Sequence, residues 1–162
     1  MLKKEKITTA LRVIFLILLL INLSVAIFEE VGFINALYSF SGIINNPFLI
    51  VKLNLFFHPL LILLGIIGVF MLRKIGYILM LLLPFYIITY KLIPLFFGLS
   101  NFESIWIKLV LASIYLIILY SRGIRYTYGL KSLKNSFLLN SLVLLSMSLL
   151  SFILLYFKGY FV

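Results

Sequence analysis

The side chains that could carry acid–base, nucleophilic or metal chemistry in this chain are few. Histidine occurs once, as His58, cysteine and aspartate are absent, and glutamate occurs only at positions 5, 29, 30 and 103. The lack of cysteine excludes disulfides, thiolate nucleophiles and cysteine metal ligands. A single histidine and four scattered carboxylates are too few for a zinc site or a hard-metal cage. We therefore expect no metal and no cofactor.

Catalytic motifs are also missing from the sequence. It contains no glycine-rich phosphate loop, no HExxH and no GxSxG, and no span carries paired carboxylates. One enzymatic hypothesis stays open, in which His58 acts as a base, with Glu30 or Glu103 as its partner, on a lipid substrate. The sequence favours a non-enzymatic protein over this hypothesis.

Long apolar runs separated by short basic clusters dominate the chain. Hydrophobic residues make up 65% of the 162 positions and charged residues 11%, and the mean hydropathy is +1.27. A soluble domain of this size could not bury so much apolar surface, so the runs require lipid. The sequence therefore predicts one integral membrane domain over residues 1–162, an all-α polytopic transmembrane bundle. The net charge of +10 belongs to residues at the ends of the runs, which indicates membrane orientation and not nucleic-acid binding.

We expect about five spans, at residues 12–28, 53–72, 75–95, 105–120 and 137–157. At 1.5 Å per residue these reach about 24–32 Å, close to the hydrocarbon thickness of a bilayer. The first run also resembles a secretory signal peptide ending at Ser24-Val25-Ala26, but we expect an uncleaved span. The charge-free stretch 31–51 contains an Asn45-Asn46-Pro47 breaker that would be costly in mid-bilayer. For Gly32 to Ile44 we therefore predict an outer interfacial or re-entrant helix.

The basic residues orient this arrangement with the N-terminus inside. Only Lys52, Lys91, Lys108 and Lys158 then lie outside, and the other basic residues follow the positive-inside rule. The richness in Phe, Ile, Leu, Tyr, Asn and Lys is typical of an AT-rich genome, so we expect a bacterial cytoplasmic membrane or an organellar inner membrane. The predicted inner basic residues are Lys3, Lys4, Lys6, Arg12, Arg73, Lys74, Arg122, Arg125, Lys131 and Lys134.

In this predicted topology, ionisable residues from separate segments gather at the outer side of the membrane. Charged groups at membrane depth are expensive unless they are paired or hydrated, so they are candidates for function. The same groups could instead lie in headgroup water or extend to it. The predicted outer-side polar cluster comprises Glu29, Glu30, His58, Lys91, Glu103 and Lys108.

Two further sets of polar residues have a predicted role. Small polar side chains on one face of the last span favour helix–helix packing, with a water-lined pore as the alternative. Basic and aromatic residues alternate in the loop before this span, which predicts contact with lipid headgroups. The packing face comprises Ser136, Asn140, Ser141, Ser148 and Ser151, and the headgroup contacts are Arg122, Arg125, Lys131 and Lys134.

Two non-enzymatic functions fit these features. The sequence favours the first, an accessory or structural subunit that binds other membrane-protein subunits, or itself, within a larger complex. The second is a homo-oligomeric ion channel or small-solute transporter, in which the outer cluster forms a vestibule. In either case we expect membrane lipids as partners and no nucleic acid.

Overall fold

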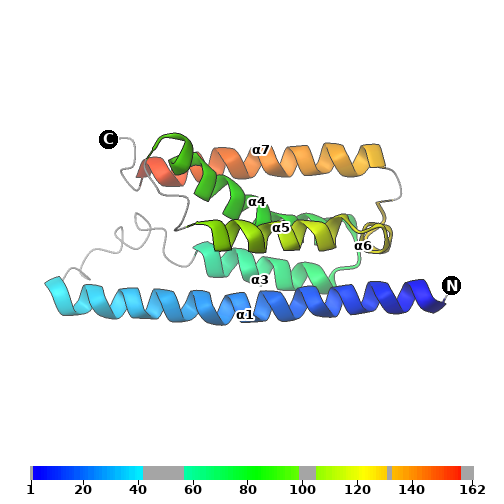
Figure 1. The fold of residues 1–162 in the computed structure, drawn as a ribbon, viewed down its shortest axis with the longest axis horizontal. Helices are drawn as coiled ribbons and strands as arrows, with labels where there is room; N and C mark the ends of the chain where they lie inside the picture. The colour runs from blue at the N-terminus through cyan, green and yellow to red at the C-terminus, as the bar shows by residue number, and fades with distance from the viewer. Residues whose placement is uncertain (1, 42–56, 99–104, 131–132, 158–162) are drawn as a thin grey trace.

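The computed structural model describes residues 2–41, 57–98, 105–130 and 133–157, and the regular structure of these residues is entirely α-helical. Figure 1 shows the longer helices side by side in a bundle, with α1, α4 and α7 running in one direction and α3 and α5 in the other. The short α6, the start of α1 and the α3–α4 turn lie together at one end, which we call the α6 end. The helices are α1 (Leu2–Ser41), α3 (Phe57–Phe70), α4 (Lys74–Phe96), α5 (Trp106–Tyr120), α6 (Arg122–Thr127) and α7 (Leu133–Phe157).

The all-α prediction is confirmed, and the apolar character of the helices fits an integral membrane protein. Among the described residues, three segments are long and apolar enough to cross a membrane, at Lys6–Gly32, Lys74–Phe96 and Ser136–Tyr156. The helices α3 and α5 are apolar but shorter, with 14 and 15 residues. The first four residues of the predicted span 53–72 lie outside the described residues.

The first helix is longer than the sequence analysis predicted. α1 runs without interruption for 40 residues, about 60 Å at 1.5 Å per residue, so it exceeds the hydrocarbon thickness of a bilayer. The prediction of a separate helix starting at Gly32 is therefore wrong as far as Ser41, and residues 42–44 lie outside the described residues. An isolated glycine costs a helix only about 1 kcal/mol, and α1 contains no proline, so nothing in this stretch ends the helix.

The helix α4 forms the centre of the bundle. Half of its candidate span is buried within the chain, compared with 17% for α1 and 28% for α7. It packs against α3, α5 and α7, and Figure 1 shows that it changes direction along its length. Pro84 and Pro94 lie inside it, and a proline in a helix removes one hydrogen bond and bends the axis. The two prolines therefore account for the bend of α4.

Two glycines allow α3 and α4 to cross closely at their shared turn. A Cβ atom built on Gly68 would lie 2.6 Å from the carbonyl oxygen of Gly76. A Cβ atom on Gly76 would lie 2.6 Å from the Gly68 carbonyl and would collide with the carbonyl of Met71. Both obstacles are backbone atoms, so a side chain at either position would push the helices apart.

Two side chains from outside α3 cap the last turn of that helix. The Arg12 guanidinium donates to the Val69 carbonyl oxygen at 2.7 Å, and the Tyr128 hydroxyl donates to the same oxygen at 2.9 Å. The last carbonyls of a helix lack intrahelical donors and carry a partial negative charge, so a cation is favourable there. Burial raises the pKa of Tyr128 and the neighbouring Arg12 opposes the shift, which keeps the hydroxyl a donor at neutral pH.

Buried tyrosines also connect other helices. Tyr115 of α5 donates to the carbonyl of Leu18 in α1 at 3.1 Å, and its ring meets Phe15 edge-on at 5.2 Å. Tyr77 of α4 donates to the carbonyl of Leu119 in α5 at 3.4 Å. A buried tyrosine combines a large apolar area with a hydroxyl that needs a partner. These contacts join α5 to both α1 and α4.

Candidate functional site

The end of the bundle opposite α6 contains a pocket between α1, α3, α4 and α5. Its volume is about 360 Å³. Three members of the predicted outer-side cluster, Glu29, His58 and Lys108, line it from three different helices. We call it the Glu29–Lys108 pocket. It is also lined by Leu18, Ile21, Asn22, Val25, Ala26, Ile87, Ile107 and Leu111.

The helical repeat of α1 determines which of its residues reach this pocket. Asn22, Ala26 and Glu29 are separated by four and three residues, so they lie on one face of the helix. Ala26 is buried, with 2% of its surface exposed, because its small side chain lets α1 approach the bundle. This face therefore carries an amide, a methyl group and a carboxylate in order toward the pocket mouth.

An ion pair lies at the mouth of the pocket. The Lys108 ammonium is 3.6 Å from a carboxylate oxygen of Glu29, and the side chains are 41% and 56% exposed. A pair this exposed contributes at most about 1 kcal/mol to stability, because water already solvates both charges. Its importance lies in placing one positive and one negative group where a solute would enter.

Polar atoms deeper in the pocket lack partners. The Nε2 atom of His58 and the Nδ2 atom of Asn22 are buried, and neither makes a hydrogen bond within the described part of the chain. A buried polar atom without a partner costs about 1–3 kcal/mol. A polar group of a bound solute could satisfy both atoms. His58 Nε2 makes no hydrogen bond to a carboxylate among the described side chains, and Glu103, one of the two partners in the enzymatic hypothesis, lies outside them.

Lys91 is near this site but does not line the pocket. Its ammonium lies 5.7 Å from the centre of the Tyr90 ring, in cation–π geometry. Tyr90 stacks on Tyr86 at 5.1 Å, and the Tyr86 ring lies 6.4 Å from that of His58. An aromatic row thus connects Lys91 to the back of the pocket.

The remaining members of the predicted cluster lie elsewhere. Glu30 follows Glu29 on α1, is not among the residues lining the pocket and has interactions of its own. Glu103 lies outside the described residues. The structure therefore brings together three of the six predicted residues directly. The structure adds Asn22, which helical spacing places on the same face of α1 as Glu29.

The predicted packing face of α7 is only partly buried. Ser136, Asn140 and Ser151 are 2%, 4% and 0% exposed, whereas the hydroxyls of Ser141 and Ser148 donate to carbonyls of their own helix. The hydroxyl of Ser151 forms a 2.7 Å hydrogen bond with that of Thr89 in α4. Sequence reasoning missed Thr89, although a polar residue in an apolar span is the usual signal of such a contact.

The predicted headgroup contacts lie at the α6 end. The Arg122 guanidinium lies 5.4 Å from the centre of the Tyr126 ring, and Arg125 donates to the carbonyl of Tyr120 at 3.1 Å. Lys131 lies outside the described residues, and Lys134 falls in the first turn of α7. The two arginines therefore emerge from the α6 region beside the start of α1.

No family model, curated protein or solved structure matches this chain. Within the described residues, no group of three or more His, Asp or Glu side chains is placed to hold a metal ion.

Proposed function

We propose that this chain is a five-span membrane protein with its N-terminus on the inner side. The alternating direction of the helices in Figure 1 supports this topology. At 14 and 15 residues, α3 and α5 reach about 21–23 Å, most of the hydrocarbon thickness. A bacterial cytoplasmic or organellar inner membrane fits the excess of basic residues at the α6 end. Among the described side chains, Lys6, Arg12, Arg73, Lys74, Arg122 and Arg125 lie there, whereas Lys91, Lys108, Glu29 and Glu30 lie toward the opposite end.

The function that the geometry supports best is binding of a small polar solute or ion from the outer side, in a channel or transporter. The observation that carries this proposal is the Glu29–Lys108 pocket, in which Glu29, His58 and Lys108 meet around one cavity. An ion pair at the mouth and unpartnered polar atoms inside form a polar site within an apolar bundle. Ionisable groups in this setting typically mark solute or ion pathways.

Flux into liposomes tests this function. Purified protein is reconstituted, and uptake of protons, sodium, potassium, chloride and small zwitterionic amino acids is measured under imposed gradients. We expect flux of at least one of these solutes, reduced several-fold by Lys108→Met or His58→Ala. The matched control is Lys74→Met, because Lys74 is exposed at the α6 end and does not line the pocket. Absence of flux for every solute, or an equal loss in Lys74→Met, would contradict the proposal.

The weak burial of α1 favours a second function, as a subunit that binds other membrane proteins. Only 17% of its candidate span is buried within the chain, and apolar residues such as Ile14, Ile17 and Ile21 are about half exposed. Lipid can cover this surface, and so can a helix of a partner subunit. Native mass spectrometry of protein extracted gently from its own membrane separates these cases. Stoichiometric foreign subunits would support the subunit function, and a partner-free monomer would contradict it.

A further inference from the structure

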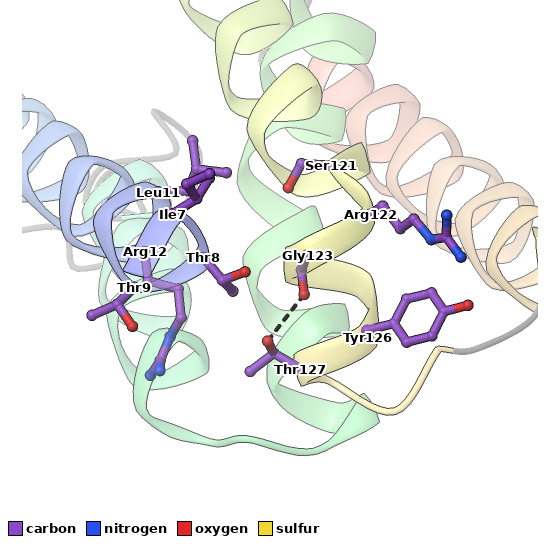
Figure 2. Close-up of a pocket in the computed structure, with 10 residues that line it drawn as sticks. All are labelled: Ile7, Thr8, Thr9, Leu11, Arg12, Ser121, Arg122, Gly123, Tyr126 and Thr127. Carbon is purple, nitrogen blue, oxygen red and sulfur yellow. Dashed lines mark hydrogen bonds between the residues drawn. The ribbon is translucent and has the colours of Figure 1, made fainter. Parts of the chain in front are cut away.

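A second pocket lies at the α6 end, between the first turns of α1 and the corner where α5 meets α6. Its volume is about 710 Å³, and Figure 2 shows the side chains that line it. Ile7 and Leu11 of α1 form an apolar wall, Arg12 and Arg122 contribute positive charge, and Ser121 contributes a hydroxyl. We call it the α1–α6 pocket. It combines a cationic and an apolar lining in one cavity.

The side chains that the structure describes around this pocket include no counter-ion for its arginines. None of the residues that line it is acidic, and the one ion pair within 4.0 Å in the described part of the chain joins Glu29 to Lys108, at the opposite end. The Nε atom of Arg12 is buried and has no hydrogen-bond partner among the described residues. Arg122 lies against the Tyr126 ring, across α6 from Ile7 in Figure 2. Both arginines therefore line the pocket, but Figure 2 shows their guanidinium groups on opposite sides of α6 and not facing each other.

The chemistry of the lining is compatible with a phosphate group. The planar guanidinium of arginine matches phosphate oxygens with two parallel hydrogen bonds. The Ser121 oxygen lies 3.5 Å from the amide nitrogen of Ile124 as an acceptor, which leaves its own O–H group available to donate. α6 approaches α1 closely beside the pocket, because a Cβ on Gly123 would collide with the side chain of Thr8. A compact tetrahedral anion fits this combination of donors.

Apolar surface continues from the pocket toward the middle of the bundle. Ile14 lies one helical turn beyond Leu11, and Ile117 lies one turn before Ser121. These side chains are 48% and 72% exposed. A free phosphate ion would use only the charged part of this surface. A molecule with an anionic head and long apolar chains would use both parts.

We propose that the α1–α6 pocket binds the phosphate headgroup of an anionic phospholipid. The headgroup lies at the rim of the pocket beside Arg122 and Ser121, and the acyl chains lie over Ile14 and Ile117. The pocket lies at the start of the first membrane-crossing segment, the depth at which headgroups are found. This inference does not depend on the proposed function, because the Glu29–Lys108 pocket is at the other end of the bundle.

Native mass spectrometry of the full chain tests the proposal. Protein from nanodiscs containing equal amounts of phosphatidylglycerol and phosphatidylcholine is released into the gas phase, and the retained lipid is counted. We expect preferential retention of phosphatidylglycerol and a five- to tenfold weaker preference in Arg122→Gln. The matched control is Arg73→Gln, which removes the same charge from an exposed arginine outside the pocket. It should change the preference less than twofold.

Several results would overturn the proposal. Equal retention of the two lipids would show that the pocket does not select charge, and equal losses in Arg122→Gln and Arg73→Gln would indicate diffuse attraction to the whole basic end. Stabilisation by millimolar inorganic phosphate equal to that by phosphatidylglycerol would identify a free-anion site. Because Arg122 is exposed, its variant should unfold in zwitterionic detergent at the wild-type temperature, so a folding defect is detected separately.

Discussion

The crossing of α3 and α4 yields the most direct test of the fold, through the substitution Gly76→Ala. The added methyl group would collide with the carbonyl of Met71 and lie 2.6 Å from that of Gly68. Relief requires a backbone shift that weakens the 2.7 Å hydrogen bond from the Arg73 amide to the Met71 carbonyl, worth about 1 kcal/mol. Overpacking adds about 1–3 kcal/mol, and the higher helix propensity of alanine returns about 1 kcal/mol. The net expectation is a loss of about 1–3 kcal/mol.

Thermal unfolding in mild detergent, followed by circular dichroism, measures this loss. For a chain of this size we expect the midpoint to fall by about 2–4 °C per kcal/mol, or about 2–12 °C in total. Gly32→Ala is the matched control. A Cβ atom at Gly32 would have nothing within 4 Å, and the substitution brings the same gain in helix propensity. Its midpoint should stay the same or rise. If Gly76→Ala unfolded at or above the temperature of Gly32→Ala, the close crossing of α3 and α4 would be refuted.

Two further substitutions test contacts between helices. Arg12→Ala removes a charged donor to the Val69 carbonyl and should lower the free energy of unfolding by about 1.5–3 kcal/mol, measured by thermal unfolding. The control Lys6→Ala removes an exposed charge and should stay within about 0.5 kcal/mol of wild type. Equal losses in the two variants would argue against the cap on α3. Thr89→Val removes the hydroxyl that bonds Ser151 and should lower the free energy of chemical unfolding by about 0.6–2 kcal/mol. Thr89→Ser keeps a hydroxyl and should retain most of the wild-type stability. If Thr89→Val were as stable as wild type, this hydrogen bond would add no stability.

The sequence predicted the helical class and the apolar segments because these depend on local composition. It failed at Gly32, where a polar and glycine-containing stretch suggested the end of a helix. Isolated Gly32 and Asn35 weaken a helix only slightly, and the stronger breaker Asn45-Asn46-Pro47 comes after the end of α1 at Ser41. Composition therefore indicated a break, but not the residue at which it occurs.

The depth of the candidate site in the membrane was predictable from the sequence, but the contacts between its residues were not. Charge patterning placed Glu29, His58 and Lys108 at a similar level, but which of them meet depends on the rotation of α1 and α5 about their axes. That rotation follows from tertiary contacts such as the Tyr115 hydroxyl on the Leu18 carbonyl, which link residues far apart in the sequence. The bond of Arg12 to Val69 likewise spans 57 residues, so no local pattern could reveal it.

The proposed function requires that water reach the Glu29–Lys108 pocket from the outer side, and the absence of native cysteine makes this access measurable. Asn22→Cys places a thiol inside the pocket, and Leu20→Cys places one at nearly the same depth on the exposed apolar face of α1. In intact cells, an impermeant charged thiol reagent should modify Asn22→Cys rapidly and Leu20→Cys very slowly. Equal protection of the two thiols would contradict an outward-opening polar pocket. Modification of Asn22→Cys only in inverted vesicles, where the reagent reaches the inner face of the membrane, would contradict it as well.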